Sequence, residues 1–167
     1  MIKVYEYRDI TKKQEKSFRR KIDNLFETGN WDKSIPPFQT YGNLHQALEA
    51  DIFVKTFLQS CSEYVGRPIE PTNLIMWCYM DYRSNYNKVK QMTGKGFHKH
   101  DMQQGGQLSG VYYLVNPRNE VTIFKDKESP KAKPFSWVIY PPNLNHRPPD
   151  IKSFRRRYTL AADLFFY

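Results

Sequence analysis

Cysteine is scarce in this chain: its 167 residues include only Cys61 and Cys78. Two cysteines outside a CxxC pair cannot build a disulfide framework, and each lies in an apolar segment. We therefore expect two buried free thiols, which suit a reducing compartment and predict a cytoplasmic protein.

Long hydrophobic runs are also missing. The N-terminus has no apolar stretch followed by the small residues of a cleavage site, and no segment approaches the length of a membrane span. Internal repeats and low-complexity segments are not visible either. We therefore expect no membrane partner, and the length suits a single domain over residues 1–167.

Acidic residues are too few to balance the basic ones. The chain has 17 Asp and Glu against 26 Lys and Arg, which gives a net charge of +9. Such a surface attracts anions, including nucleic acid, acidic proteins and small carboxylates. The basic residues are spread along the chain, so a solvated basic surface with no dedicated partner is an equally good interpretation.

Aromatic residues are abundant, at 16% of the chain, and they favour strands. After residue 70 apolar segments follow one another without helical spacing, separated by glycine and proline. The expected strands are 74–82, 108–115, 121–125, 135–140 and 157–166. Strands in succession predict an antiparallel sandwich or barrel.

The first 70 residues have a different, mostly helical pattern. A short strand is expected within 1–10, followed by a helix that begins at a Thr11–Gln14 capping box and ends near Gly29. A second helical stretch, of one or two helices, is expected over 43–65 and ends at Gly66. We therefore predict an α+β protein, mainly β with N-terminal helices, in which residues 1–70 support a β core over 71–167.

Three of the four histidines are candidate metal ligands. His98 and His100 alternate along an extended segment, so both point to one side with Lys99 opposite. His146 follows a predicted strand and lies between two proline pairs, on a stiff loop. Imidazole binds Fe, Zn, Cu or Ni, and Asp101 offers a carboxylate instead. Isolated histidines of these kinds are more often surface or turn residues.

A candidate anion clamp lies on the last predicted strand. Arg157 and Thr159 share one face of it, with Tyr158, Leu160 and Ala162 on the other. A guanidinium fork beside a hydroxyl matches the two oxygens of a carboxylate. The competing interpretation is an exposed basic run over 155–157.

These segments together resemble the 2-oxoglutarate- and Fe(II)-dependent oxygenases. The resemblance covers residues 74–166 and is strongest to short members with a His-x-His…Leu-Ser-Gly-Val-Tyr-Tyr signature, some of them encoded by bacteriophages. The stretches that carry it are Phe97-His-Lys-His100, Leu108-Ser-Gly-Val-Tyr-Tyr-Leu114, Phe124-Lys-Asp126, Trp137-Val-Ile-Tyr-Pro141 with His146, and Arg157-Tyr-Thr159. It implies a double-stranded β-helix, the jelly-roll barrel that cupins share. For a phage protein, the cytoplasm would be that of the host cell.

The resemblance also implies roles for individual residues. His98 matches the first metal ligand, His146 matches the distal ligand, and His100 stands where the family has a carboxylate. Asp101 remains an alternative ligand. The residues that match those holding the far carboxylate of 2-oxoglutarate are Tyr113, Arg157 and Thr159, with Arg156 as an alternative to Arg157.

The activity that this implies is hydroxylation with Fe(II), 2-oxoglutarate and O2, with no catalytic residue beyond the metal centre. A protein side chain such as prolyl is the first expectation for the substrate and a nucleobase the second; the oligomeric state is not predicted. The loop before the first histidines contains Lys88, Lys90 and Lys95, and we predict that this loop is a mobile substrate lid. The alternatives are a cupin-type metal dioxygenase that does not use 2-oxoglutarate and a non-catalytic jelly-roll binding module.

Overall fold

The described part of the protein consists of a large antiparallel sheet, a small sheet, two α-helices and two short 3-10 helices. The computed structural model describes residues 1–32, 38–82, 96–100 and 105–167. In chain order the elements are β1 (Lys3–Glu6), α1 (Lys12–Glu27), two short 3-10 helices (Leu44–Gln46 and Leu48–Ala50), α2 (Asp51–Val65), β2 (Pro71–Asp81), β3 (Gly106–Val115), β4 (Ile123–Phe124), β5 (Ser136–Tyr140), β6 (His146–Arg147) and β7 (Arg157–Phe166). No helix in the described ranges is long and apolar enough to span a membrane.

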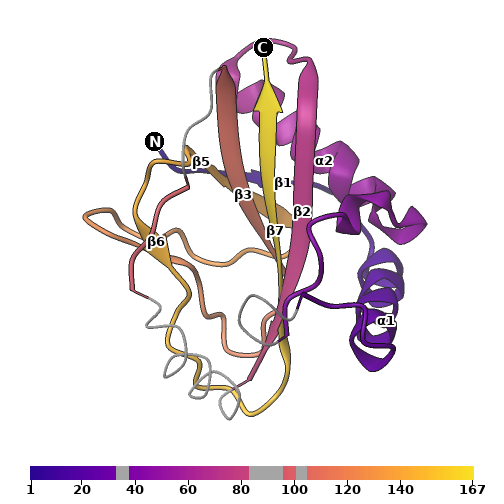
Figure 1. Ribbon diagram of the computed structural model, residues 1–167. Helices are drawn as coiled ribbons and strands as arrows, with labels where there is room; N and C mark the ends of the chain where they lie inside the picture. Colours follow the sequence, from indigo (N-terminus) through magenta and orange to yellow (C-terminus); the bar gives the residue numbers. More distant parts are fainter. Residues whose placement is uncertain (33–37, 83–95, 101–104) are drawn as a thin grey trace.

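The large sheet has the strand order β1-β5-β3-β7-β2, and every neighbouring pair is antiparallel. The small sheet consists of β4 and β6. Helices α1 and α2 lie to one side of the large sheet, and β6 lies to the other side (Figure 1). The expected mainly β architecture with N-terminal helices is therefore confirmed.

The helix boundaries follow the signals read from the sequence. Thr11 and Gln14 form the predicted reciprocal capping box at the start of α1, and Gly29, just beyond its end, has a left-handed φ of 75°. Gly66 ends α2 in the same left-handed conformation, with φ 80°. These expectations are confirmed.

Alternation along the strands separates two packing environments. On the helix side, Tyr112 of β3 and Trp137 of β5 join Phe18 and Phe53 of the helices in the main core. On the opposite side, Val111, Val138 and Ala161 belong to a smaller cluster with Phe124 of the small sheet. Gly110 has no side chain because a Cβ there would come within 2.6 Å of Phe57 of α2. Both cysteines are buried, as predicted, and burial raises the pKa of each thiol.

The small sheet was predicted only in part. The strand expected over 121–125 is shortened to Ile123–Phe124, and β6 at His146–Arg147 was expected to be loop. Strand β6 forms because the backbone of His146 pairs with both Phe124 and His98. A strand of two residues leaves no alternation in the sequence, so only its partners across the fold define it.

Candidate metal centre

The three candidate histidines meet on the side of the large sheet that faces away from the helices. His98 and His146 exchange two backbone hydrogen bonds, of 2.9 and 2.8 Å. The amide of His100 donates to the carbonyl of Pro142 at 2.9 Å. Because His98 and His100 are two apart on an extended segment, both rings turn toward His146, and the ring centroids lie 4.5 and 5.1 Å from that of His146.

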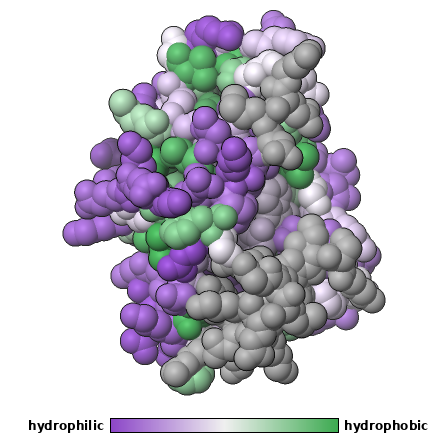
Figure 2. Space-filling view, turned by 60° about the vertical axis from the view of Figure 1, so that its left-hand side comes forward, coloured by the Kyte–Doolittle hydropathy of each residue, from purple (hydrophilic) through white to green (hydrophobic). Residues whose placement is uncertain are grey.

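One ring nitrogen from each histidine lies within 4.8 Å of those from the other two. Metal–imidazole bonds are about 2.1 Å long, so two nitrogens on one ion lie at most ~4.2 Å apart. Small movements of the rings therefore bring three nitrogens onto one ion. His146 is buried, His100 half-buried and His98 exposed, so the cluster opens to solvent on one side. Figure 2 turns this side forward: its described part is mainly hydrophilic, with small hydrophobic patches.

Hydrogen bonds define which nitrogen of two rings is available. Nδ1 of His146 lies 2.8 Å from the carbonyl oxygen of Leu144, which only accepts, so Nδ1 carries the proton and Nε2 has the lone pair. Burial lowers the pKa of His146 to about 4, against a weaker upward effect of the Leu144 carbonyl, and neighbouring His98 and His100 lower it further. His146 is therefore neutral near pH 7, the state that binds a metal.

The sequence interpretation missed Asp163, the acidic partner of this cluster. Its carboxylate oxygen lies 2.9 Å from Nδ1 of His100 and accepts a 2.5 Å hydrogen bond from the hydroxyl of Ser109. Strand β7 carries Asp163 on the same face as Arg157 and Thr159, and β3 pairs Ser109 directly opposite it. Extending the alternation from Thr159 by four residues places Asp163 on this face of the strand, but it does not predict the contact with His100.

Arg157 and Thr159 are buried on the predicted face. Arg157 is only 2% exposed; its Nη1 lies 3.4 Å from a carboxylate oxygen of Asp81, and its guanidinium stacks over the ring of Tyr113. Among the described residues, neither Nε of Arg157 nor Oγ1 of Thr159 has a hydrogen-bond partner. The hydroxyl of Tyr113 accepts from the amide of Thr122 at 2.8 Å, and a phenol hydroxyl is also a donor that a carboxylate can accept from. These three side chains therefore offer donors that a carboxylate would satisfy.

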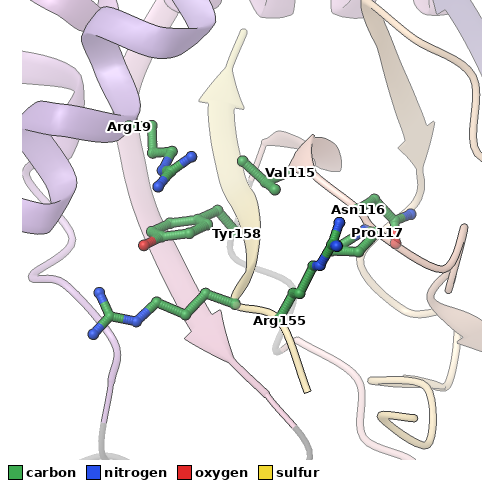
Figure 3. Close-up of a pocket in the computed structure, with 7 residues that line it drawn as sticks. Arg19, Val115, Asn116, Pro117, Arg155 and Tyr158 are labelled. Atoms are coloured by element: carbon green, nitrogen blue, oxygen red, sulfur yellow. The ribbon is translucent and has the colours of Figure 1, made fainter. Parts of the chain in front are cut away.

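The neighbouring Arg156 belongs to a different surface. Its side chain is 57% exposed and pairs with Asp23 of α1 on the helix side. Together with Arg19 and Arg155 it lines an open hollow of about 590 Å³ between α1 and the start of β7 (Figure 3). Tyr158 forms part of its wall, and none of the three histidines lines it. Of the two alternatives for the clamp, only Arg157 lies on the histidine side of the sheet.

Two predictions lie outside the described residues. These are the possible metal ligation by Asp101 and the lid at Lys88, Lys90 and Lys95. Both stay predictions.

No protein-family model matches the chain, and no curated protein matches it. Solved structures do match. A prolyl-4-hydroxylase from Pseudomonas putida is similar with a TM-score of 0.63 at 11% identity, over 98% of this chain and 91% of that one. A prolyl hydroxylase from Trichoplax adhaerens, in complex with a peptide of the hypoxia inducible factor oxygen degradation domain, gives 0.59 at 12% identity, over 98% and 83%. AviO1 from Streptomyces viridochromogenes Tue57 gives 0.62 at 12% identity, over 92% and 83%.

This likeness establishes the fold. At these low identities the likeness shows only that the strands and helices are arranged similarly. This arrangement agrees with the expected jelly-roll-like architecture. Closure of the two sheets into a complete double-stranded β-helix stays a prediction, as does the single-domain organisation. The function has to be inferred from the residues of this chain, because a shared fold does not imply a shared function.

Proposed function

We propose that this protein is a hydroxylase that depends on Fe(II) and 2-oxoglutarate. The observation that carries the proposal is the cluster of His98, His100 and His146 on the same sheet face as a buried guanidinium and hydroxyl with unused donors. A metal site and a carboxylate clamp on one face are what such a co-substrate requires. The fold shared with prolyl hydroxylases supports the proposal.

The metal site fits the donors that are present. Neutral imidazoles suit Fe(II), and Nε2 of His146 is free for it because Nδ1 is bonded to a carbonyl. Phe124 and Tyr140 pack on the ring of His146, with centroids 6.1 and 5.1 Å away, and exclude water from its buried side. When bound, Fe(II) with 2-oxoglutarate and O2 supplies the chemistry of C–H hydroxylation.

The clamp residues bind and orient the co-substrate. Arg157 keeps Nε for one carboxylate oxygen, and Thr159 and Tyr113 each have a hydroxyl to donate. Thr159 lies directly opposite Tyr113 in the pairing of β7 with β3, so the two residues are neighbours on the same part of the sheet. Asp81 already neutralises part of the Arg157 charge, and a dianion entering the site would compete with it for the guanidinium.

For the substrate we propose a protein side chain, with prolyl first. Phe97, beside the exposed His98, is 42% exposed and stacks with the guanidinium of Arg147, which forms a partly apolar, cationic rim to the site. Such a rim suits an extended peptide with acidic residues. A nucleobase substrate is the other outcome of a substrate screen, favoured by the net charge of +9.

The test is anaerobic titration of the Fe(II)-loaded protein with 2-oxoglutarate, followed by visible absorption. We expect stoichiometric iron binding and a charge-transfer band that saturates with 2-oxoglutarate. The His98→Ala/His146→Ala double variant should bind neither. Iron binding without a band would overturn the role of 2-oxoglutarate, and absence of iron binding would make the histidines structural.

A cupin-type metal dioxygenase that does not use 2-oxoglutarate is the second candidate. It is favoured by the donor set, because three imidazoles gather here in place of two imidazoles and a carboxylate. This candidate leaves the unused donors of Arg157 and Thr159 without a ligand. It therefore predicts wild-type metal-dependent activity in Arg157→Met.

A further inference from the structure

One carboxylate on the histidine side of the large sheet has no part in the clamp. Asp163 is 8% exposed and sits four residues along β7 from Thr159, which places their Cα atoms ~13 Å apart. Within the described ranges, no lysine or arginine lies in ion-pair distance of it; its partners are His100 and Ser109. Burying a carboxylate without a strong cation is costly, and the hydrogen bonds with His100 and Ser109 are what offsets that cost here.

The contacts of Asp163 hold His100 in one state. A carboxylate only accepts, so the 2.9 Å contact places the proton of His100 on Nδ1 and leaves the lone pair on Nε2. The hydroxyl of Ser109 donates to the same oxygen and fixes the carboxylate in turn. With the amide of His100 bonded to Pro142, the ring is held at its backbone and at one nitrogen.

The two bonded histidines differ in the charge behind them. Nδ1 of His146 donates to a neutral carbonyl, whereas Nδ1 of His100 donates to a carboxylate. A charged acceptor behind an imidazole increases its basicity and strengthens its bond to a metal. Three neutral imidazoles alone would leave an Fe(II) site with a net charge of about +2, whereas two imidazoles and a carboxylate, with its negative charge, would lower the net charge to about +1.

We propose that Asp163 is a positioning residue that supplies this negative charge through His100. His100 binds the metal through Nε2, and Asp163, held by Ser109, orients the ring and increases its donor strength without contacting the ion. The inference rests on the proposed function, because it assigns His100 as a metal ligand. It explains how a histidine functions at the place where the resemblance expects a carboxylate.

The test compares metal affinity in variants that separate charge from shape. Asp163→Asn keeps an oxygen that can accept from His100 and removes the charge; Asp163→Ala removes both. Anaerobic competition of Co(II) against a chelator should show about tenfold weaker binding for Asp163→Asn and about 100-fold for Asp163→Ala. Ser109→Ala should fall between wild type and Asp163→Asn. The matched carboxylate control is Asp23→Asn in α1, which lies on the opposite side of the large sheet from the histidines. This variant should keep wild-type affinity for Co(II).

A second readout needs no metal. In the metal-free protein, nitrogen-15 NMR of the imidazoles should show His100 protonated at Nδ1 in wild type and a mixture of tautomers in Asp163→Ala. Wild-type affinity and an unchanged tautomer in both Asp163 variants would overturn the inference and leave the proposed function intact. If wild type binds no Co(II) or Fe(II), the proposed function fails together with it. A Co(II) spectrum showing Asp163 as a direct ligand would also overturn it.

Discussion

The two faces of strand β7 carry opposite kinds of residue although both are buried. On the helix side are Tyr158, Leu160, Ala162, Leu164 and Phe166, all of them members of the main core. On the histidine side are Arg157, Thr159, Ala161 and Asp163, each at most 8% exposed. One strand thus contributes an apolar face to the core and a polar face to the candidate site.

The two faces of β7 are expected to contribute differently to the free energy of unfolding. Apolar burial on the helix side stabilises the fold by about 1.5–3 kcal/mol for each large side chain. On the other face, a buried hydroxyl or guanidinium nitrogen without a partner costs about 1–3 kcal/mol. Within the described residues, Oγ1 of Thr159 and Nε of Arg157 are in that state. Such groups are expected where a ligand satisfies them.

The largest effect on stability is expected on the helix side. Leu160→Ala removes a fully buried side chain and should lower the free energy of unfolding by about 2–5 kcal/mol, measured by urea denaturation. The protein that remains folded at low temperature should bind Fe(II) with wild-type affinity. Weakened metal binding in that folded fraction would contradict the separation of the two faces.

The largest effect on ligand binding is expected from Arg157→Met. Loss of a charge-assisted fork should weaken 2-oxoglutarate binding about 100-fold, or ~2.7 kcal/mol, in calorimetry on the Mn(II)-loaded protein. Arg156→Met, one residue earlier and on the helix side, is the matched control and should bind normally. Because Asp81 would lose its cation, the change is also made in an Asp81→Asn background. Equal losses in Arg156→Met and Arg157→Met would show general charge attraction instead of a clamp.

The predictions from the sequence that agree with the structure depend mostly on strand alternation and on helix-capping residues. The faces of β7, the capping box at Thr11 and the end of α2 at Gly66 each depend on a few neighbouring residues, and all agree with the structure. The gathering of His98, His100 and His146 needed the family resemblance, because no local pattern brings distant segments together.

The role of Asp163 could not be predicted from the sequence. Its role depends on pairing with Ser109, which is 54 residues away, and on a histidine from a third segment. Neither the sequence separation nor a known motif connects these residues. Only the register of β3 on β7, which places Ser109 opposite Asp163, makes the contact evident.

The smallest effects on stability are expected from substitutions of two threonines whose hydroxyls differ in their hydrogen-bond partners. Thr56 of α2 donates to the carbonyl of Ile52 at 2.8 Å and accepts from Nε1 of Trp137 at 3.0 Å, whereas Oγ1 of Thr159 has no partner within the described residues. Thr56→Val should therefore destabilise the metal-free protein by about 1–2 kcal/mol, and Thr159→Val should leave stability unchanged or raise it by up to about 1 kcal/mol.

Ligand binding should show the reverse order. Thr159→Val should weaken 2-oxoglutarate about tenfold in the same calorimetric titration, because one hydrogen bond to the carboxylate is lost, and Thr56→Val should bind normally. A destabilised Thr159→Val protein with normal affinity would mean that this hydroxyl serves the fold. The polar face of β7 would then be structural at that position, and the clamp would reduce to Arg157 and Tyr113.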